Sequence, residues 1–154
     1  MDRIKYRLSK EGLEHIKEYE QFRSKAYRPV KGDRWTIGWG NTFYKDGSPV
    51  KDGDVITLDE ANELLNSIIY RFEFHVNKLI KTDLNQNQFD ALLSFTYNVG
   101  TGNLQHSTLL KIVNTDPNNF PEIERQFLRW NKSGGKVYNG LIKRRKSEFD
   151  LYCK

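Results

Sequence analysis

Residues 20–42 read EQFRSKAYRPVKGDRWTIGWGNT, and this stretch decides how the chain folds. Its turn signal, KGD at 31–33, separates a polar first arm from a second arm, WTIGW at 35–39, that is rich in aromatic and β-branched residues. A further turn signal, DGS, follows at 46–48. We therefore predict a small antiparallel sheet of three short strands in this part of the chain.

The residues before this stretch predict a helix that ends near Glu20. Ser9 suits the N-cap position, and Leu13 and Ile16 mark an apolar face that Glu20 shares by helical spacing. Burial and the negative end of the helix dipole both favour the neutral carboxylic acid, which is the form a general acid needs. By periodicity alone, a glutamate that turns to solvent or pairs with an arginine is the commoner alternative.

A long helix is predicted after the sheet, followed by shorter ones. Thr57 and Glu60 have the spacing of a capping box, and apolar residues then recur at helical spacing as far as Ile80. Further helical segments begin at Asn85, at Ser107 and near Asn119, the last broken at 134–135, and a final helix carries the apolar residues of 141–152. This order of elements predicts an α+β fold.

Composition excludes several classes of protein. The chain has 154 residues, which fits one domain, and its 9 Phe, 8 Tyr and 3 Trp can fill a core although only 37% of residues are hydrophobic. The single cysteine, Cys153, rules out an internal disulfide, and the three histidines are widely spaced, so we expect no metal and no cofactor. Neither a signal sequence nor a membrane span is visible, so we expect no stable membrane insertion.

The formal charge of +5 suits an anionic partner, such as nucleic acid, a membrane or an acidic wall polymer. The basic residues are scattered rather than striped along the sequence, which argues against nucleic acid.

Several separated motifs, in order, make residues 9–152 resemble the phage-type lysozymes, the muramidases of glycoside hydrolase family 24. Besides residues 20–42, the matching segments are LNQNQFDAL at 84–92, YNVG at 97–100 and GLIKRRKSE at 140–148. The resemblance implies a lysozyme-like α+β fold, in which a small antiparallel β-lobe is joined by a long helix to a mostly α-helical lobe. We expect one domain over 1–154, with the β-lobe at about 25–56, the linking helix at about 57–81, and the helical lobe at about 84–152 plus the N-terminal helix.

The resemblance also implies a function. Such a protein is an endolysin, which hydrolyses the β-1,4 bond between N-acetylmuramic acid and N-acetylglucosamine in bacterial peptidoglycan and so lyses the host. We expect a monomer that stays in the host cytoplasm until it is released to the cell wall, with peptidoglycan as its partner.

The family's catalytic signature is matched only in part. Glu20 matches the general acid and Thr36 the threonine, but Pro29 stands where the family has an aspartate, and the turn has gained one residue. Asp33 is the nearest replacement, and the alternative is an ordinary turn aspartate. The resemblance implies inversion, with Thr36 and an acidic neighbour orienting the attacking water.

Five further residues are expected to bind substrate or to support the site: Tyr27, Tyr97, Asn98, Arg144 and Arg145. The amide of Asn98 offers a donor and an acceptor to an N-acetyl group. In the family an arginine of the last helix pairs with the catalytic glutamate. A helix-face salt bridge between Arg145 and Glu148, worth under about 1 kcal/mol, is the alternative.

Two rival functions stay open at this point. The loss of the acid at Pro29 is typical of a peptidoglycan-binding protein of the same fold with weakened catalysis. The net positive charge is typical of a basic nucleic-acid-binding protein, which would bind DNA with an affinity that falls steeply with salt.

Overall fold

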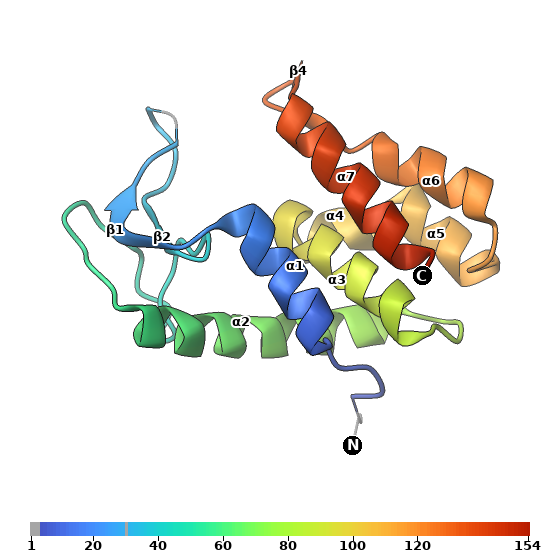
Figure 1. Ribbon diagram of the computed structural model, residues 1–154, viewed down its shortest axis with the longest axis horizontal. Coiled ribbons are helices and arrows are strands. Elements are labelled where there is room, and N and C mark those ends of the chain that lie inside the picture. The colour runs from blue at the N-terminus through green and yellow to red at the C-terminus, as the bar shows by residue number, and fades with distance from the viewer. Residues whose placement is uncertain (1–3, 30) are drawn as a thin grey trace. The chain divides into compact units, whose positions relative to one another are not determined.

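The computed structural model describes residues 4–29 and 31–154, and Figure 1 shows the course of the chain. The chain forms two compact units. One consists of residues 14–71, and the other combines the residues before position 14 with those from Phe72 onward. Helices α1, Lys10–Glu20, and α2, Leu58–Leu79, each contribute residues to both units. The prediction of one lysozyme domain with its lobe boundaries stays a prediction.

Helix α1 begins and ends as the sequence predicts. The hydroxyl oxygen of Ser9 accepts a hydrogen bond from the N–H of Gly12 at 3.1 Å, which satisfies one of the free donors at the start of the helix. Ile16 is fully buried, and Leu13 and Glu20 are half-buried. The apolar face predicted for this helix is therefore confirmed, with Glu20 on its margin.

The sheet of residues 14–71 has two strands rather than three. Strand β1, Arg23–Tyr27, pairs antiparallel with β2, Thr36–Gly38. Arg23 lies opposite Gly38 and Tyr27 opposite Thr36, and the register is irregular between these two pairs. In place of the expected third strand there are isolated bridges, one between Lys25 of β1 and Val55 and another between Phe43 and Pro49. At the second bridge, proline has no backbone N–H to donate, so that ladder does not extend. The prediction of a small antiparallel sheet is confirmed, and the prediction of a third strand in it is wrong.

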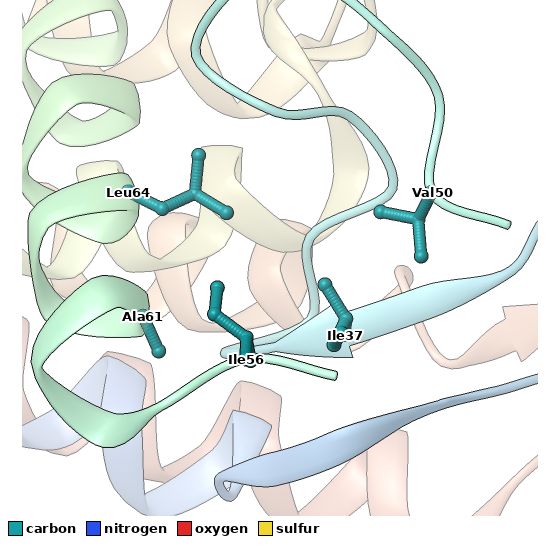
Figure 2. Packing of buried hydrophobic residues seen from close by; sticks show 5 residues of the cluster. All are labelled: Ile37, Val50, Ile56, Ala61 and Leu64. Atoms are coloured by element: carbon teal, nitrogen blue, oxygen red, sulfur yellow. The ribbon is translucent and has the colours of Figure 1, made fainter. Parts of the chain in front are cut away.

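The apolar core of this unit lies between β2 and the start of α2. Figure 2 shows five buried side chains, from β2, the loops after it and the first turns of α2, gathered around a common interior: Ile37, Val50, Ile56, Ala61 and Leu64. Half-buried aromatic rings, among them Trp35, Trp39 and Tyr44, pack around them. The aliphatic residues alone would form only a small core, and the large aromatic rings add further apolar surface to it.

The predicted capping box begins α2. The N–H of Glu60 donates to Oγ1 of Thr57 at 3.1 Å, and the N–H of Thr57 donates to Oε1 of Glu60 at 3.0 Å. The helix has 22 residues, close to the range expected from its apolar spacing. Among the residues that the structure describes, no helix combines the length and the apolarity needed to cross a bilayer.

The other unit is helical. Its helices after α2 are α3 (Gln86–Val99), α4 (Thr101–Gln105), α5 (Thr108–Thr115), α6 (Phe120–Leu128) and α7 (Asn139–Tyr152). Helix α3 packs against α7 and α4, and its residues 88–96 are all buried, which makes it the centre of the unit (Figure 1). The predicted starts at Asn85 and Ser107 are confirmed, since both side chains accept a backbone N–H from the first turn.

One part of this unit differs from the prediction. The helical segment expected from Asn119 is confined to α6, and a short hairpin follows, formed by β3 (Lys132–Ser133) and β4 (Lys136–Val137). Gly134 and Gly135 connect the two strands with φ of 56° and 80°, a left-handed conformation that tight hairpin turns require. The glycine pair therefore makes a turn between strands rather than a break in a helix.

Candidate active site

Glu20 is placed by the way α1 ends. The next residue, Gln21, has φ of 54°, an uncommon left-handed value for a residue with a side chain. Its N–H donates to the carbonyl of Lys17 at 2.9 Å, which closes the last turn of the helix. The chain then reverses into β1, so the Glu20 side chain is held where helix and sheet meet.

A glycine turn after β2 brings main chain against the Glu20 carboxyl group. Ile37 and Asn41 exchange two backbone hydrogen bonds, 2.8 and 2.9 Å long, around this turn. Gly40 in the turn has φ of 81°, and a Cβ at this position would collide with Oε2 of Glu20. Glycine is therefore favoured by the backbone conformation, and a side chain here would push the Glu20 carboxyl group out of its place.

Sequence reasoning missed the role of Gly40. The signal that could have found it is the pair of glycines directly after a buried strand, where a tight turn or a close backbone approach is the usual reason.

Trp39 anchors the same turn. Its indole N–H donates to Oδ1 of Asn62 on α2 at 3.0 Å, and its ring packs on Phe22 with the ring centroids 5.6 Å apart. These contacts tie the turn to α2 and to the start of β1, so the main chain beside Glu20 has little freedom to move.

Thr36 lies in β2, opposite Tyr27 of β1. Its side chain is buried, and its hydroxyl donates to the carbonyl of Arg34 at 3.2 Å. A hydroxyl whose hydrogen is donated in this way still accepts hydrogen bonds through its oxygen, which is what the orientation of a water requires. Tyr27 is half-buried, with the Arg23 guanidinium 4.6 Å from its ring centroid.

Asp33 lies in the connection between β1 and β2, and it is exposed. Within residues 4–29 and 31–154, its side chain makes no hydrogen bond or ion pair. Pro29, which the resemblance in sequence aligns with the family's aspartate, is exposed in the same connection. The base role of Asp33 stays a prediction.

Tyr97 and Asn98 belong to the helical unit, near the C-terminal end of α3. The Tyr97 ring lies against Phe72, with the ring centroids 5.4 Å apart, and Asn98 is exposed. The helix ends at Val99, and Gly100 caps it. Their binding of saccharide stays a prediction.

Arg144 and Arg145 surround Glu148 on α7. Oε1 of Glu148 is 2.7 Å from Nε of Arg145, and Oε2 is 3.2 Å from Nε of Arg144. The hydroxyl of Ser94 donates to Oε2 at 2.8 Å. Burial raises the pKa of the Glu148 carboxyl, against the opposing effect of the two guanidinium groups.

The salt bridge that the sequence offered as the alternative role for Arg145 is therefore present. It is fully buried, with Arg145 and Glu148 both 0% exposed, so the small free energy typical of surface pairs does not apply to it. A supporting role of either arginine in catalysis stays a prediction. Among the described residues, no group of three or more histidine, cysteine, aspartate or glutamate side chains is arranged to hold a metal ion.

Comparison with known proteins agrees with the fold and with the motif. A sequence profile of the family described as Phage lysozyme matches residues 17–148. The endolysin of Bacillus phage B103 is 47% identical over 146 residues, which are 94% of this chain and 53% of the relative. This chain thus spans about half the length of that relative.

Two solved structures match over nearly their whole length. The endolysin from Escherichia coli O157:H7 phage FAHEc1 has a TM-score of 0.85 at 38% identity, with 96% of this chain and 94% of that chain covered. The muramidase domain of SpmX from Asticaccaulis excentricus has a TM-score of 0.83 at 32% identity, with 97% and 99% covered. The lysozyme-like α+β fold is confirmed, and this chain belongs to the phage lysozyme family.

Proposed function

We propose that this protein is an endolysin, a muramidase that cleaves the β-1,4 bond between N-acetylmuramic acid and N-acetylglucosamine in bacterial peptidoglycan. Family membership and the muramidase domain among the similar structures support the reaction class. The observation that carries the proposal is the half-buried carboxyl of Glu20 at the end of α1, seated against the main chain at Gly40.

In this mechanism Glu20 donates its proton to the oxygen of the leaving sugar. As the bond to that oxygen breaks, the anomeric carbon gains oxocarbenium character and a water attacks it from the opposite face of the ring. Thr36 accepts a hydrogen bond from this water and orients it. Asp33 takes the proton that the water gives up, and the configuration at the anomeric carbon is inverted.

Three further predicted residues contribute to substrate binding. Tyr27 packs beside Thr36 in the sheet, while Tyr97 and Asn98 contact the glycan. The partner is peptidoglycan, and the protein acts as a monomer without nucleic acid. It remains in the host cytoplasm until it is released to the wall at the end of the lytic cycle.

Analysis of the ends formed in digested peptidoglycan tests the reaction. Purified walls are incubated with the protein or with Glu20→Gln, and the soluble products are reduced and identified by mass spectrometry. We expect new reducing N-acetylmuramic acid ends with the parent protein and none with the variant.

The other outcomes separate the rivals. Anhydro-muramic ends would identify a transglycosylase and overturn the hydrolytic mechanism. Wall binding with no new ends would support the rival function of a peptidoglycan-binding protein with weakened catalysis. That rival was suggested by the proline at position 29. Tight binding to DNA that weakens steeply with salt would support the nucleic-acid rival.

A further inference from the structure

The unit of residues 14–71 separates its charges by position. In this unit the basic residues are concentrated rather than scattered as we expected from the sequence. Residues 21–45 hold six lysines and arginines and one carboxylate, Asp33, whereas the rest of the unit holds three basic residues and nine acidic ones. Five of the six cations lie on β1 and on the connection to β2, and all five are exposed: Arg23, Lys25, Arg28, Lys31 and Arg34. We call these five residues the cationic hairpin (Figure 1, the blue segment through β1).

None of these five cations is neutralised by an ion pair within residues 4–29 and 31–154. Elsewhere the chain does pair exposed cations, as in the contacts of Lys5 with Asp83 and of Lys154 with Glu11. An exposed group of like charges repels itself, and an anionic partner relieves that repulsion.

The three arginines of the cationic hairpin lie over aromatic rings. The guanidinium carbons are 4.6 Å from the ring centroid of Tyr27 for Arg23, and 4.7 Å from that of Trp35 for Arg28. The guanidinium of Arg34 is 5.1 Å from the ring centroid of Phe43. An aromatic face restricts a long side chain and leaves the N–H edges of the guanidinium free to donate.

A guanidinium edge binds the two oxygens of a phosphate with two parallel hydrogen bonds. Five cations within 12 residues suit a polymer that carries one charge on each repeating unit, rather than a single small anion. Such a polymer is available where this protein acts if it degrades bacterial walls, because phosphodiester polymers can be attached to peptidoglycan.

We propose that the cationic hairpin binds the phosphodiester groups of an anionic polymer attached to the bacterial wall, and thereby holds the protein on its substrate. This inference rests on the proposed function, since it takes the wall as the target. The net positive charge of the chain predicted an anionic partner. In this proposal, that partner binds to the cationic hairpin, and the bound group is a phosphodiester.

Binding is measured with the full chain carrying Glu20→Gln, so that the walls stay intact. Untreated walls are compared with walls from which hydrofluoric acid has removed the phosphodiester polymers, and bound protein is measured by co-sedimentation. One variant combines Arg23→Gln, Arg28→Gln and Arg34→Gln. The matched control combines Lys111→Gln, Lys143→Gln and Lys146→Gln, three exposed cations of the helical unit.

We expect the hairpin variant to bind untreated walls roughly tenfold more weakly, because three exposed charge contacts are lost. The control should lose less than about threefold, and acid treatment should abolish the difference between the two variants. Equal weakening of both variants would show that only net charge matters. A difference that survives acid treatment would place the ligand in the glycan or in its peptide carboxylates. Either result overturns the proposal.

Competition tests the ligand without any change to the hairpin. Soluble poly(glycerol phosphate), poly-glutamate and single-stranded oligo-dT of matched charge compete with untreated walls for the Glu20→Gln protein. Poly(glycerol phosphate) should be the strongest competitor, and stronger competition by either of the other two overturns the proposal. Because no step requires hydrolysis, failure here leaves the muramidase test unaffected, and the reverse also holds.

Discussion

Glu20 and Glu148 are carboxylates in different units, and the structure treats them in opposite ways. Glu20 ends α1 half-exposed, against main chain at Gly40, whereas Glu148 is inaccessible and bound to two arginines and Ser94. The first is open to solvent and the second is not. The difference teaches that exposure, rather than a charge motif, separates a carboxylate that can transfer a proton from one that stabilises the fold.

Glu20→Gln should give the largest change in activity. The amide has almost the same shape but has no proton to donate, so wall lysis should fall by about 10²–10⁴-fold. The free energy of unfolding should change by less than about 1 kcal/mol. Turbidity of a wall suspension and urea unfolding measure the two quantities. Activity within tenfold of the parent would refute the assignment of the general acid.

Glu148→Ala should show the opposite profile, with a large loss of stability. Removal of a buried carboxylate leaves the charges of Arg144 and Arg145 in the interior without it, at a cost of about 3–5 kcal/mol. Urea unfolding measures the loss, with Glu124→Ala, an exposed glutamate on α6, as the control. A cost below about 1 kcal/mol would mean that the buried pair behaves as a surface pair.

Asp33→Asn should cost roughly a hundredfold in activity if this exposed carboxylate is the base. Thr36→Ala should then be comparably damaging, because both residues hold one water, and the pH profile of Asp33→Asn should lose one ionisation. The control is Asp52→Asn, another exposed turn aspartate. If Asp33→Asn and Asp52→Asn behave alike, Asp33 is a turn residue and Thr36 positions the water alone.

Gly40→Ala should have a smaller, mixed effect. The new Cβ would displace the Glu20 carboxyl and would strain a residue with φ of 81°, so we expect a loss of about 1–3 kcal/mol and about tenfold in activity. Gly47→Ala is the matched control, because Gly47 has φ of 88° and no atom within 4 Å of the added Cβ. Only Gly40→Ala should lower activity, and equal activity of the two variants would contradict the close contact.

Asp54→Asn should give the smallest effect, a slight change in the melting temperature. The backbone N–H of Lys51 and the hydroxyl of Tyr44 donate to its carboxylate and lower its pKa. A lowered pKa stabilises the folded state above the unfolded pKa of about 4, and that contribution disappears as the pH falls through the folded value. Asp54→Asn should therefore lower the melting temperature slightly at pH 7, by an amount that shrinks towards pH 3. A constant difference would show that the charge is not involved.

The amino-acid sequence alone determined the features of this protein that depend on neighbouring residues. The caps at Ser9, Thr57, Asn85 and Ser107 are all confirmed, because each is a contact between residues within about one helical turn. The position of Glu20 at the margin of the apolar face was also predicted from helical spacing, whereas its role as the general acid stays a prediction. The alternation of turn signals and β-prone residues likewise predicted a small antiparallel sheet.

Only the tertiary structure decided which residues meet across long separations. The contact of Gly40 with Glu20 joins residues 20 positions apart, and the bond of Ser94 to Glu148 joins residues 54 positions apart. The sequence predicted a third strand that does not form and missed the β3–β4 hairpin, because both depend on which segments pair in the folded chain. Local preferences permit several pairings, and the packing of the core selects among them, because burial free energy depends on where distant segments come together.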